Sequence, residues 1–169
     1  MLKIPRSVFV MIALLMVQRA GAQQPVTTLI LVRHAEKDMT LSTPDPDLSP
    51  EGRERAKRLA AMFKNTNLSA VFSTPYRRTR QTVEPLAALH GLPVTDYAAG
   101  NLQEIDKIFN QHAGKTVFIC GHSNTIPALV NYLIGQDRYQ VFDDNDYGNI
   151  IVVSVTAPGK PGSVVWITY

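Results

Sequence analysis

The sequence predicts a single α/β domain of three layers, in which helices cover both faces of a mostly parallel central sheet. Two observations support this prediction. Apolar segments rich in β-branched residues alternate with segments of helical periodicity, which is typical of βαβ units. The chain has 169 residues, which is enough for one domain with a hydrophobic core of its own.

The predicted elements follow one another along the chain. Residues 26–32 are apolar or β-branched throughout, which indicates a buried strand. Ser49 and Pro50 are typical of the N-cap and first position of a helix. Further strands are expected over residues 70–73, 92–95, 116–120, 149–156 and 164–169. Helices are expected over residues 50–64, 79–89, 101–112 and 125–134.

Residues 1–22 are expected to be a secretory signal peptide. Two basic residues precede an apolar run over residues 8–17, and an A-x-A pattern that ends at Ala22 follows the run. The run is shorter than the roughly 20 residues that span a bilayer, so no stable membrane insertion is expected after cleavage. Residues 23–169 would then form the exported domain, in the periplasm or outside the cell. The alternative is an ordinary buried N-terminal helix.

Charge and cysteine content narrow the classes of partner. The formal net charge is +3, but the predicted signal peptide carries three basic residues and no acid, so the exported domain would be neutral. A nucleic-acid partner, which would require a basic face, is therefore not expected. The single cysteine, Cys120, lies among apolar neighbours and is expected to be a buried thiol. No Cys/His cluster has the spacing of a zinc site, so no metal is expected.

Polar residues follow two of the predicted strands where each strand ends. Arg33 and His34 follow residues 26–32, and Gly121 and His122 follow residues 116–120. In open α/β sheets, ligands bind beyond the carboxyl ends of the strands. The two histidines are therefore expected to meet at this edge of the sheet.

These residue types suit phosphoryl transfer. A neutral imidazole is a competent nucleophile at neutral pH, provided that its second ring nitrogen is held by an acceptor. Guanidinium groups match the phosphoryl oxygens on which charge develops. Arg33 is adjacent to His34, and Arg77, Arg78 and Arg80 open the helix after the strand at 70–73. Arg77 and Arg80 are expected on a solvated helix face.

Three stretches of the chain, in order, carry the motifs of a known family. They are LVRHAEK at residues 31–37, STPYRRTRQT at residues 73–82 and CGHSNT at residues 120–125. LSPEG at residues 48–52 is a weaker fourth match. The chain resembles the histidine phosphatase superfamily, also called the phosphoglycerate mutase-like family.

The resemblance implies a phosphoglycerate mutase-like fold and a role for each matched residue. His34 would be the phosphorylated nucleophile, and Arg33, Arg78 and His122 would hold the phosphoryl group. The family needs no cofactor or metal for this chemistry. The proton donor is less well defined: Glu104, in Leu102-Gln103-Glu104, resembles the acid of the mutase branch but also completes a cap that starts at Asn101. Glu36 and Asp38 are the other candidates.

The expected function is hydrolysis of phosphomonoesters or related phosphorylated compounds by an exported phosphatase, through a phosphohistidine intermediate. The short chain leaves little room for a large cap domain, so an open pocket is expected, which would suit a bulky substrate such as a phosphorylated envelope glycan or a phosphoprotein. A phosphorylated small molecule is the other expected class of substrate. Two alternatives remain open. One is a phosphoglycerate mutase-type phosphotransferase, and the other is a phosphate-binding module with impaired catalysis.

Overall fold

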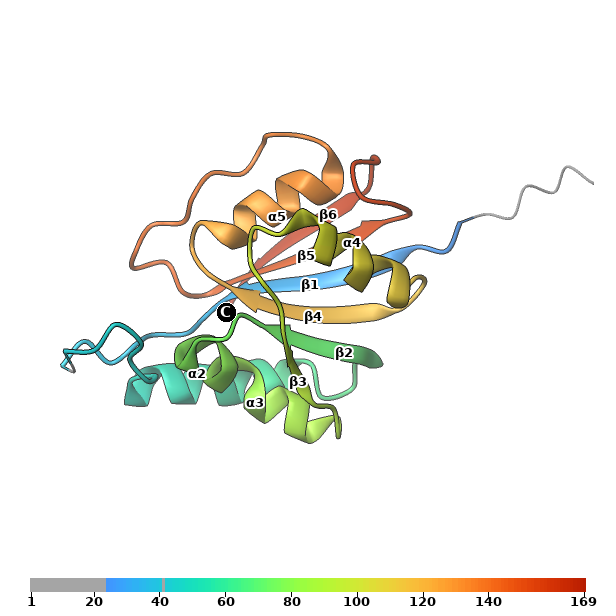
Figure 1. Ribbon diagram of the computed structural model, residues 1–169. Helices are drawn as coiled ribbons and strands as arrows, with labels where there is room; N and C mark the ends of the chain where they lie inside the picture. The colour runs from blue at the N-terminus through green and yellow to red at the C-terminus, as the bar shows by residue number, and fades with distance from the viewer. Residues whose placement is uncertain (1–23, 41) are drawn as a thin grey trace, which may run out of the picture.

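The computed structural model describes residues 24–40 and 42–169, so the predicted signal peptide lies outside the described residues. The described residues form a six-stranded sheet and four helices (Figure 1). The strands are β1 (Thr27–Arg33), β2 (Leu68–Ser73), β3 (Val94–Asp96), β4 (Thr116–Gly121), β5 (Asn149–Val155) and β6 (Ser163–Thr168). The helices are α2 (Pro50–Met62), α3 (Arg77–Leu89), α4 (Leu102–Gln111) and α5 (Thr125–Ile134). Every predicted strand and helix is present, with small shifts at the ends.

The strand order is β3-β2-β4-β1-β5-β6. The pairs β3–β2, β2–β4 and β4–β1 are parallel, whereas β5 runs antiparallel to β1 and β6 antiparallel to β5. The sheet is therefore mixed. The reason lies in residues 135–148, which follow α5 and return to the carboxyl end of β1 before β5 begins. Two backbone carbonyls of this segment, of Asp143 and Asp146, accept hydrogen bonds from Arg33 there.

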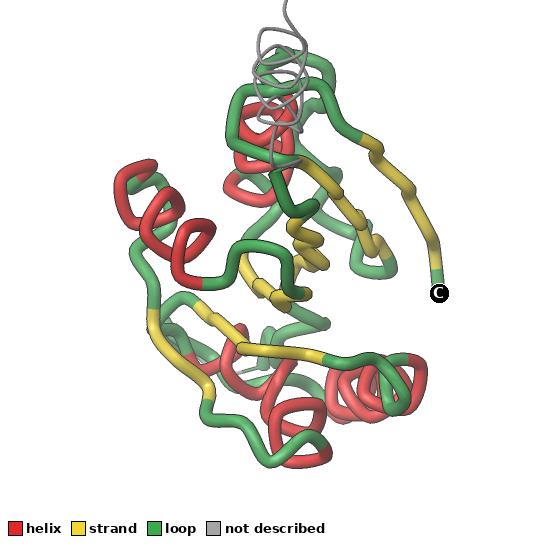
Figure 2. Tube along the Cα trace, turned by 90° about the vertical axis from the view of Figure 1, so that its right-hand side faces the viewer, coloured by secondary structure: helices red, strands yellow, loops and turns green. Residues whose placement is uncertain are grey.

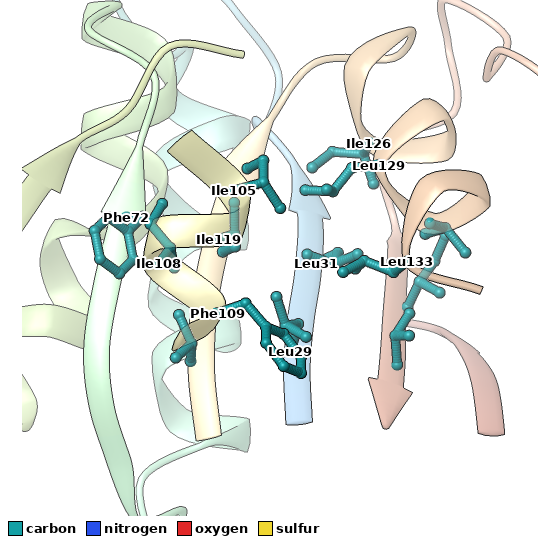
Figure 3. Close-up of a cluster of buried hydrophobic side chains, with 14 of the residues drawn as sticks. Leu29, Leu31, Phe72, Ile105, Ile108, Phe109, Ile119, Ile126, Leu129 and Leu133 are labelled. Atoms are coloured by element: carbon teal, nitrogen blue, oxygen red, sulfur yellow. The ribbon is translucent and has the colours of Figure 1, made fainter. Parts of the chain in front are cut away.

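Helices cover both faces of the sheet, as predicted. Figure 1 shows α2 and α3 on one face and α4 and α5 on the other, and Figure 2 shows the strands between them. Side chains of β1 alternate between the two faces: Leu29 and Leu31 pack with α4 and α5, and Ile30 and Val32 with α2 and α3. Figure 3 shows the first of these two cores. Cys120 is fully buried in the second core, which confirms the prediction for this thiol.

Local contacts explain two of the sequence motifs. Ser49 caps α2 by accepting the Gly52 N–H at 3.1 Å, and Pro50 occupies the first turn. A Cβ atom at Gly52 would lie 2.2 Å from the Glu36 carbonyl oxygen, so the LSPEG stretch requires glycine at this position. Within the described part of the chain, no helix has both the length and the apolar character needed to cross a membrane.

Candidate active site

Three neighbouring strands end at one edge of the sheet and bring their following residues together. Arg33 pairs with Gly121 in the β1–β4 register. The His34 N–H donates to the Gly121 carbonyl at 2.9 Å, and the Thr74 N–H donates to the Cys120 carbonyl at 3.3 Å. His34, His122 and Thr74 therefore follow three adjacent strands.

A pocket of about 570 Å³ lies at this edge. Four of the five site residues predicted from the sequence line it: Arg33, His34, Arg78 and His122. The ring centroids of His34 and His122 lie 5.6 Å apart. The two histidines therefore lie close together at this edge of the sheet, as predicted, although they are distant in sequence.

His34 is held as a neutral imidazole with a defined tautomer. Its Nδ1 lies 2.7 Å from the Ala35 carbonyl oxygen, a geometry in which Nδ1–H donates and Nε2 keeps its lone pair. The side chain is buried, and burial lowers the pKa of His34 to about 3, although the bond to Ala35 opposes this shift. The nearby Arg33 and Arg78 charges lower the pKa further. At neutral pH, the ring is therefore available as a nucleophile.

His122 is held by a chain of hydroxyl groups. Its Nε2 lies 3.0 Å from Thr74 Oγ1, and the Thr74 hydroxyl donates to Thr79 Oγ1 at 2.9 Å. Because the Thr79 hydroxyl donates to backbone carbonyls, Thr74 accepts a hydrogen bond from Nε2–H of His122. Burial lowers the pKa of His122 to about 4, and Arg78 and Arg33 contribute to this shift. His122 is thus neutral at neutral pH, with Nδ1 left for a ligand.

Arg33 is fixed from two sides. Its Nη1 donates to the carbonyls of Asp143 at 2.8 Å and Asp146 at 3.0 Å, and its guanidinium carbon lies 4.2 Å from the Tyr147 ring centroid. The side chain is only 4% exposed, and its buried Nε has no partner among the described residues. A buried donor without a partner is rare. Arg33 also lines the pocket.

Arg78 is held by an acidic residue from a distant loop. Its Nη1 donates to Asp45 at 3.2 Å, and its guanidinium stacks on Tyr76 at 4.5 Å. Asp45 also accepts the Arg77 N–H at 3.1 Å, and it thereby caps α3, whose own N-cap residue makes no side-chain cap bond. Arg77 itself is exposed and pairs with Asp47, as expected for a solvated position.

The acidic residues predicted as proton donors do not line the pocket. Glu104 accepts the Ala98 N–H at 2.9 Å, and its own N–H donates to Asn101, so the cap interpretation of this residue agrees with the structure. Both carboxylate oxygens of Glu36 accept hydrogen bonds from Arg55 Nε, at 2.8 and 2.9 Å. Burial opposes a low pKa of Glu36, but the contacts with Arg55 outweigh it and hold the pKa low. Asp38 is bound to Thr40 at the surface.

The sequence analysis missed two charged residues that line the pocket, Lys37 and Asp144. Lys37 lies three residues after His34, in the same motif, and this proximity was a usable signal. Asp144 lies in the segment 135–148, whose backbone carbonyls bind Arg33. No local sequence pattern predicted that Asp144 would line the pocket. Among the described residues, no group of three or more His, Cys, Asp or Glu side chains is arranged to hold a metal ion.

Comparison with solved structures defines the fold family. A phosphoglycerate mutase from Bacillus anthracis has the same fold, with a TM-score of 0.67, 14% identity, and coverage of 85% of this chain and 93% of the other. A phosphoserine phosphatase from Entamoeba histolytica, in complex with 3-phosphoglyceric acid, has a TM-score of 0.66, 17% identity, and coverage of 85% and 98%. The chain therefore has a phosphoglycerate mutase-like fold.

Sequence similarity relates part of the chain to one family. The family model of the histidine phosphatase superfamily (branch 1) matches residues 29–106, which include His34 and Arg78. Phosphoserine phosphatase 1 of Hydrogenobacter thermophilus is 38% identical over 71 residues, which are 39% of this chain and 34% of the relative. The chain spans about a third or less of the length of the curated relatives it matches. The chain is similar to the histidine phosphatase superfamily over residues 29–106 of its length.

Proposed function

We propose that this chain hydrolyses phosphomonoesters in two steps, through a phosphohistidine on His34. The observation that carries the proposal is the bond from His34 Nδ1 to the Ala35 carbonyl, which leaves Nε2 as an unprotonated nucleophile inside a pocket lined by two guanidinium groups. An unprotonated ring nitrogen beside fixed cations is what attack on a phosphate ester requires.

In the first step, His34 Nε2 attacks phosphorus while the bond from phosphorus to the ester oxygen breaks. Arg33 and Arg78 hold the phosphoryl oxygens, and His122 donates to them once a proton reaches Nδ1. In the second step, water attacks the phosphohistidine, inorganic phosphate leaves and His34 is regenerated. Because the guanidinium groups supply the positive charge, we propose that the reaction needs no metal.

The leaving oxygen of the first step requires a proton unless the leaving group is already a weak base. We propose Asp144 for this role in place of Glu104, because it is the acidic side chain that lines the pocket among the described residues. Protonated, it would donate to the ester oxygen and then, as a carboxylate, accept a proton from the attacking water.

Export remains a separate proposal, supported by the basic, apolar and A-x-A pattern of residues 1–22. Fractionation of cells that express the full chain, followed by N-terminal sequencing, tests it. Recovery of a chain that begins at residue 23 outside the cytoplasm supports export. A full-length cytoplasmic chain contradicts it.

The catalytic proposal is tested with residues 23–169 and p-nitrophenyl phosphate, assayed from acidic to alkaline pH in the presence of a chelator. The His34→Ala variant should lose turnover, whereas His90→Ala should keep it, because His90 contacts the Phe63 carbonyl away from the pocket. Quenching with denaturant at alkaline pH should trap a labelled His34. Tight vanadate binding without turnover of any phosphate ester would instead identify a phosphate-binding module. Equal activity of both variants would exclude His34 as the nucleophile.

A further inference from the structure

A second, smaller hollow adjoins the pocket that contains His34 and His122, which we call the phosphate pocket. The smaller hollow is called the apolar groove. Its lining residues come from the segment that leads from β3 into α4, from α4 and from the start of α5. Its lining includes Tyr97, Leu102, Ile105, Ala128 and Leu129. No charged side chain lines it in the part of the chain that the structure describes. The groove is therefore a surface for an apolar group.

The groove and the phosphate pocket share part of their walls. Ala99, Asn124 and Thr125 line both. Asn124 and Thr125 come directly after the His122 turn, where the His122 N–H donates to Thr125 Oγ1 at 2.9 Å. A group attached to a phosphate beside His122 thus has a direct route into the groove.

The outer wall of the groove is held in place by polar contacts. The Tyr97 N–H donates to the Ser73 carbonyl at 2.9 Å, and Glu104 accepts the Ala98 N–H. Tyr97 is only 3% exposed, and a Cβ at Gly121 would come within 2.9 Å of its hydroxyl oxygen. The wall is therefore preformed, and Glu104 contributes to it through its contact with the backbone.

The volume of the groove sets the size of its occupant. At about 190 Å³, it exceeds the roughly 150 Å³ of an apolar protein cavity known to accept benzene. A phenyl ring or a short alkyl chain fits this space. A charged amine or carboxylate would lose hydration there without gaining a partner.

We propose that the apolar groove binds the leaving group of the substrate, so that the enzyme prefers phosphomonoesters of apolar alcohols or phenols over those of charged alcohols such as serine. The proposal rests on the proposed function, because it assigns the substrate class of the same site. The proposed preference differs from that of phosphoserine phosphatase 1 of Hydrogenobacter thermophilus, whose name indicates phosphoserine as its substrate.

Binding of phosphonates tests the proposal without requiring turnover. The protein is titrated by calorimetry with inorganic phosphate and with methyl-, ethyl-, propyl-, butyl- and phenylphosphonate. In the wild type, the dissociation constant should fall about three- to fourfold for each methylene group until the groove is filled. The Ala128→Gln variant, which places a polar side chain in the groove from an exposed helix position, should abolish this gain and leave phosphate binding unchanged.

The matched control is Ala88→Gln, at an exposed position of α3 outside both pockets, and it should behave as the wild type does. Intact phosphate binding with no dependence on chain length in the wild type would overturn the groove proposal alone. Failure of phosphate and all phosphonates to bind would overturn the proposed function and the groove proposal together. The same chain-length gain in Ala128→Gln and the wild type would show that the chain lies elsewhere and would also overturn the proposal.

Discussion

Nε2 of His122 and Oγ1 of Thr74 lie 3.0 Å apart, and the Thr74 hydroxyl is turned toward Thr79. This contact assigns the tautomer of His122 and leaves Nδ1 for the phosphoryl group. Thr74 also lines the pocket, but no step of the mechanism proposed above uses it, so we infer that its role is to position His122.

Replacement of Thr74 by valine should lower kcat/KM by about tenfold, the size expected for one buried hydrogen bond of about 1–1.5 kcal/mol. Valine keeps the shape of the side chain and removes the acceptor of the His122 bond. The Thr74→Ser variant should restore most of the activity, because it restores the hydroxyl. The check is steady-state kinetics with p-nitrophenyl phosphate, and wild-type kinetics for Thr74→Val would argue against this role.

Stability should decrease as the pH falls from 6.5 toward 4. Burial lowers the pKa of His34 to about 3 and that of His122 to about 4, below the 6.5 of an unperturbed histidine. The unfolded chain therefore takes up these protons first, and the loss levels off once the folded histidines titrate as well. The expected loss from the pair is on the order of 5 kcal/mol.

Urea unfolding at several pH values measures this loss. The double variant His34→Gln, His122→Gln should show a shallower dependence over the same range, because glutamine does not titrate. Glu36, whose pKa is held low by Arg55, is present in both proteins, so its contribution to the pH dependence of stability cancels in the comparison. An identical pH dependence in the two proteins would contradict the assignment of both buried histidines.

The Asp45→Asn variant should bind inorganic phosphate severalfold more tightly than the wild type. The Asp45 carboxylate accepts a hydrogen bond from Arg78 at 3.2 Å and would compete with an anionic ligand for the charge of Arg78. Asp47→Asn is the matched control, since Asp47 pairs with Arg77, which does not line the pocket. Calorimetry distinguishes the outcomes: weaker phosphate binding in Asp45→Asn would mean that Asp45 mainly positions Arg78.

Substitution of the acidic residues should separate their roles by the leaving group of the substrate. The Asp144→Asn variant should lower kcat/KM for an alkyl phosphate by about a hundredfold and leave kcat/KM for p-nitrophenyl phosphate nearly unaffected, because kcat/KM reports formation of the phosphohistidine and nitrophenolate departs without a proton. Glu104→Gln should change both substrates to the same small extent, since Glu104 contacts the Ala98 backbone. Equal losses of kcat/KM on both substrates in Asp144→Asn would exclude it as the proton donor.

Gly52→Ala should destabilise the fold by about 1–3 kcal/mol, since the added Cβ would lie 2.2 Å from the Glu36 carbonyl oxygen and force the backbone to move. Thermal unfolding measures the effect. Glu51→Ala, at the exposed neighbouring position, serves as the control and should stay close to the wild type. An unchanged melting temperature for Gly52→Ala would show that this approach of the two segments is not tight.

Much of the fold and part of the site could be predicted from local sequence. The β-branched runs define β1 and β4, and the residues that follow them, His34 and His122, meet because parallel strands share an edge. The placement of Arg78 rather than Arg77 followed from the family motif, and the start of α3 turns Arg78 to the pocket and Arg77 to Asp47. The patterns that predict these features each involve residues close together in the chain, although His34 and His122 themselves are far apart in sequence.

The sequence alone determined the succession of strands and helices along the chain and the caps of α2 and α4, because these follow from short-range periodicity and capping chemistry. The histidine and arginine motifs can also be read directly from the sequence. Only the tertiary structure decided the antiparallel entry of β5, the capping of α3 by Asp45, the placement of Glu104 outside the pocket and that of Asp144 beside it. The placements of β5, Asp45 and Asp144 each depend on where a long loop returns to the sheet, whereas that of Glu104 depends on the short segment between β3 and α4. The path of such a loop is set by contacts such as those of Arg33 with Asp143 and Asp146, more than a hundred residues apart in the chain.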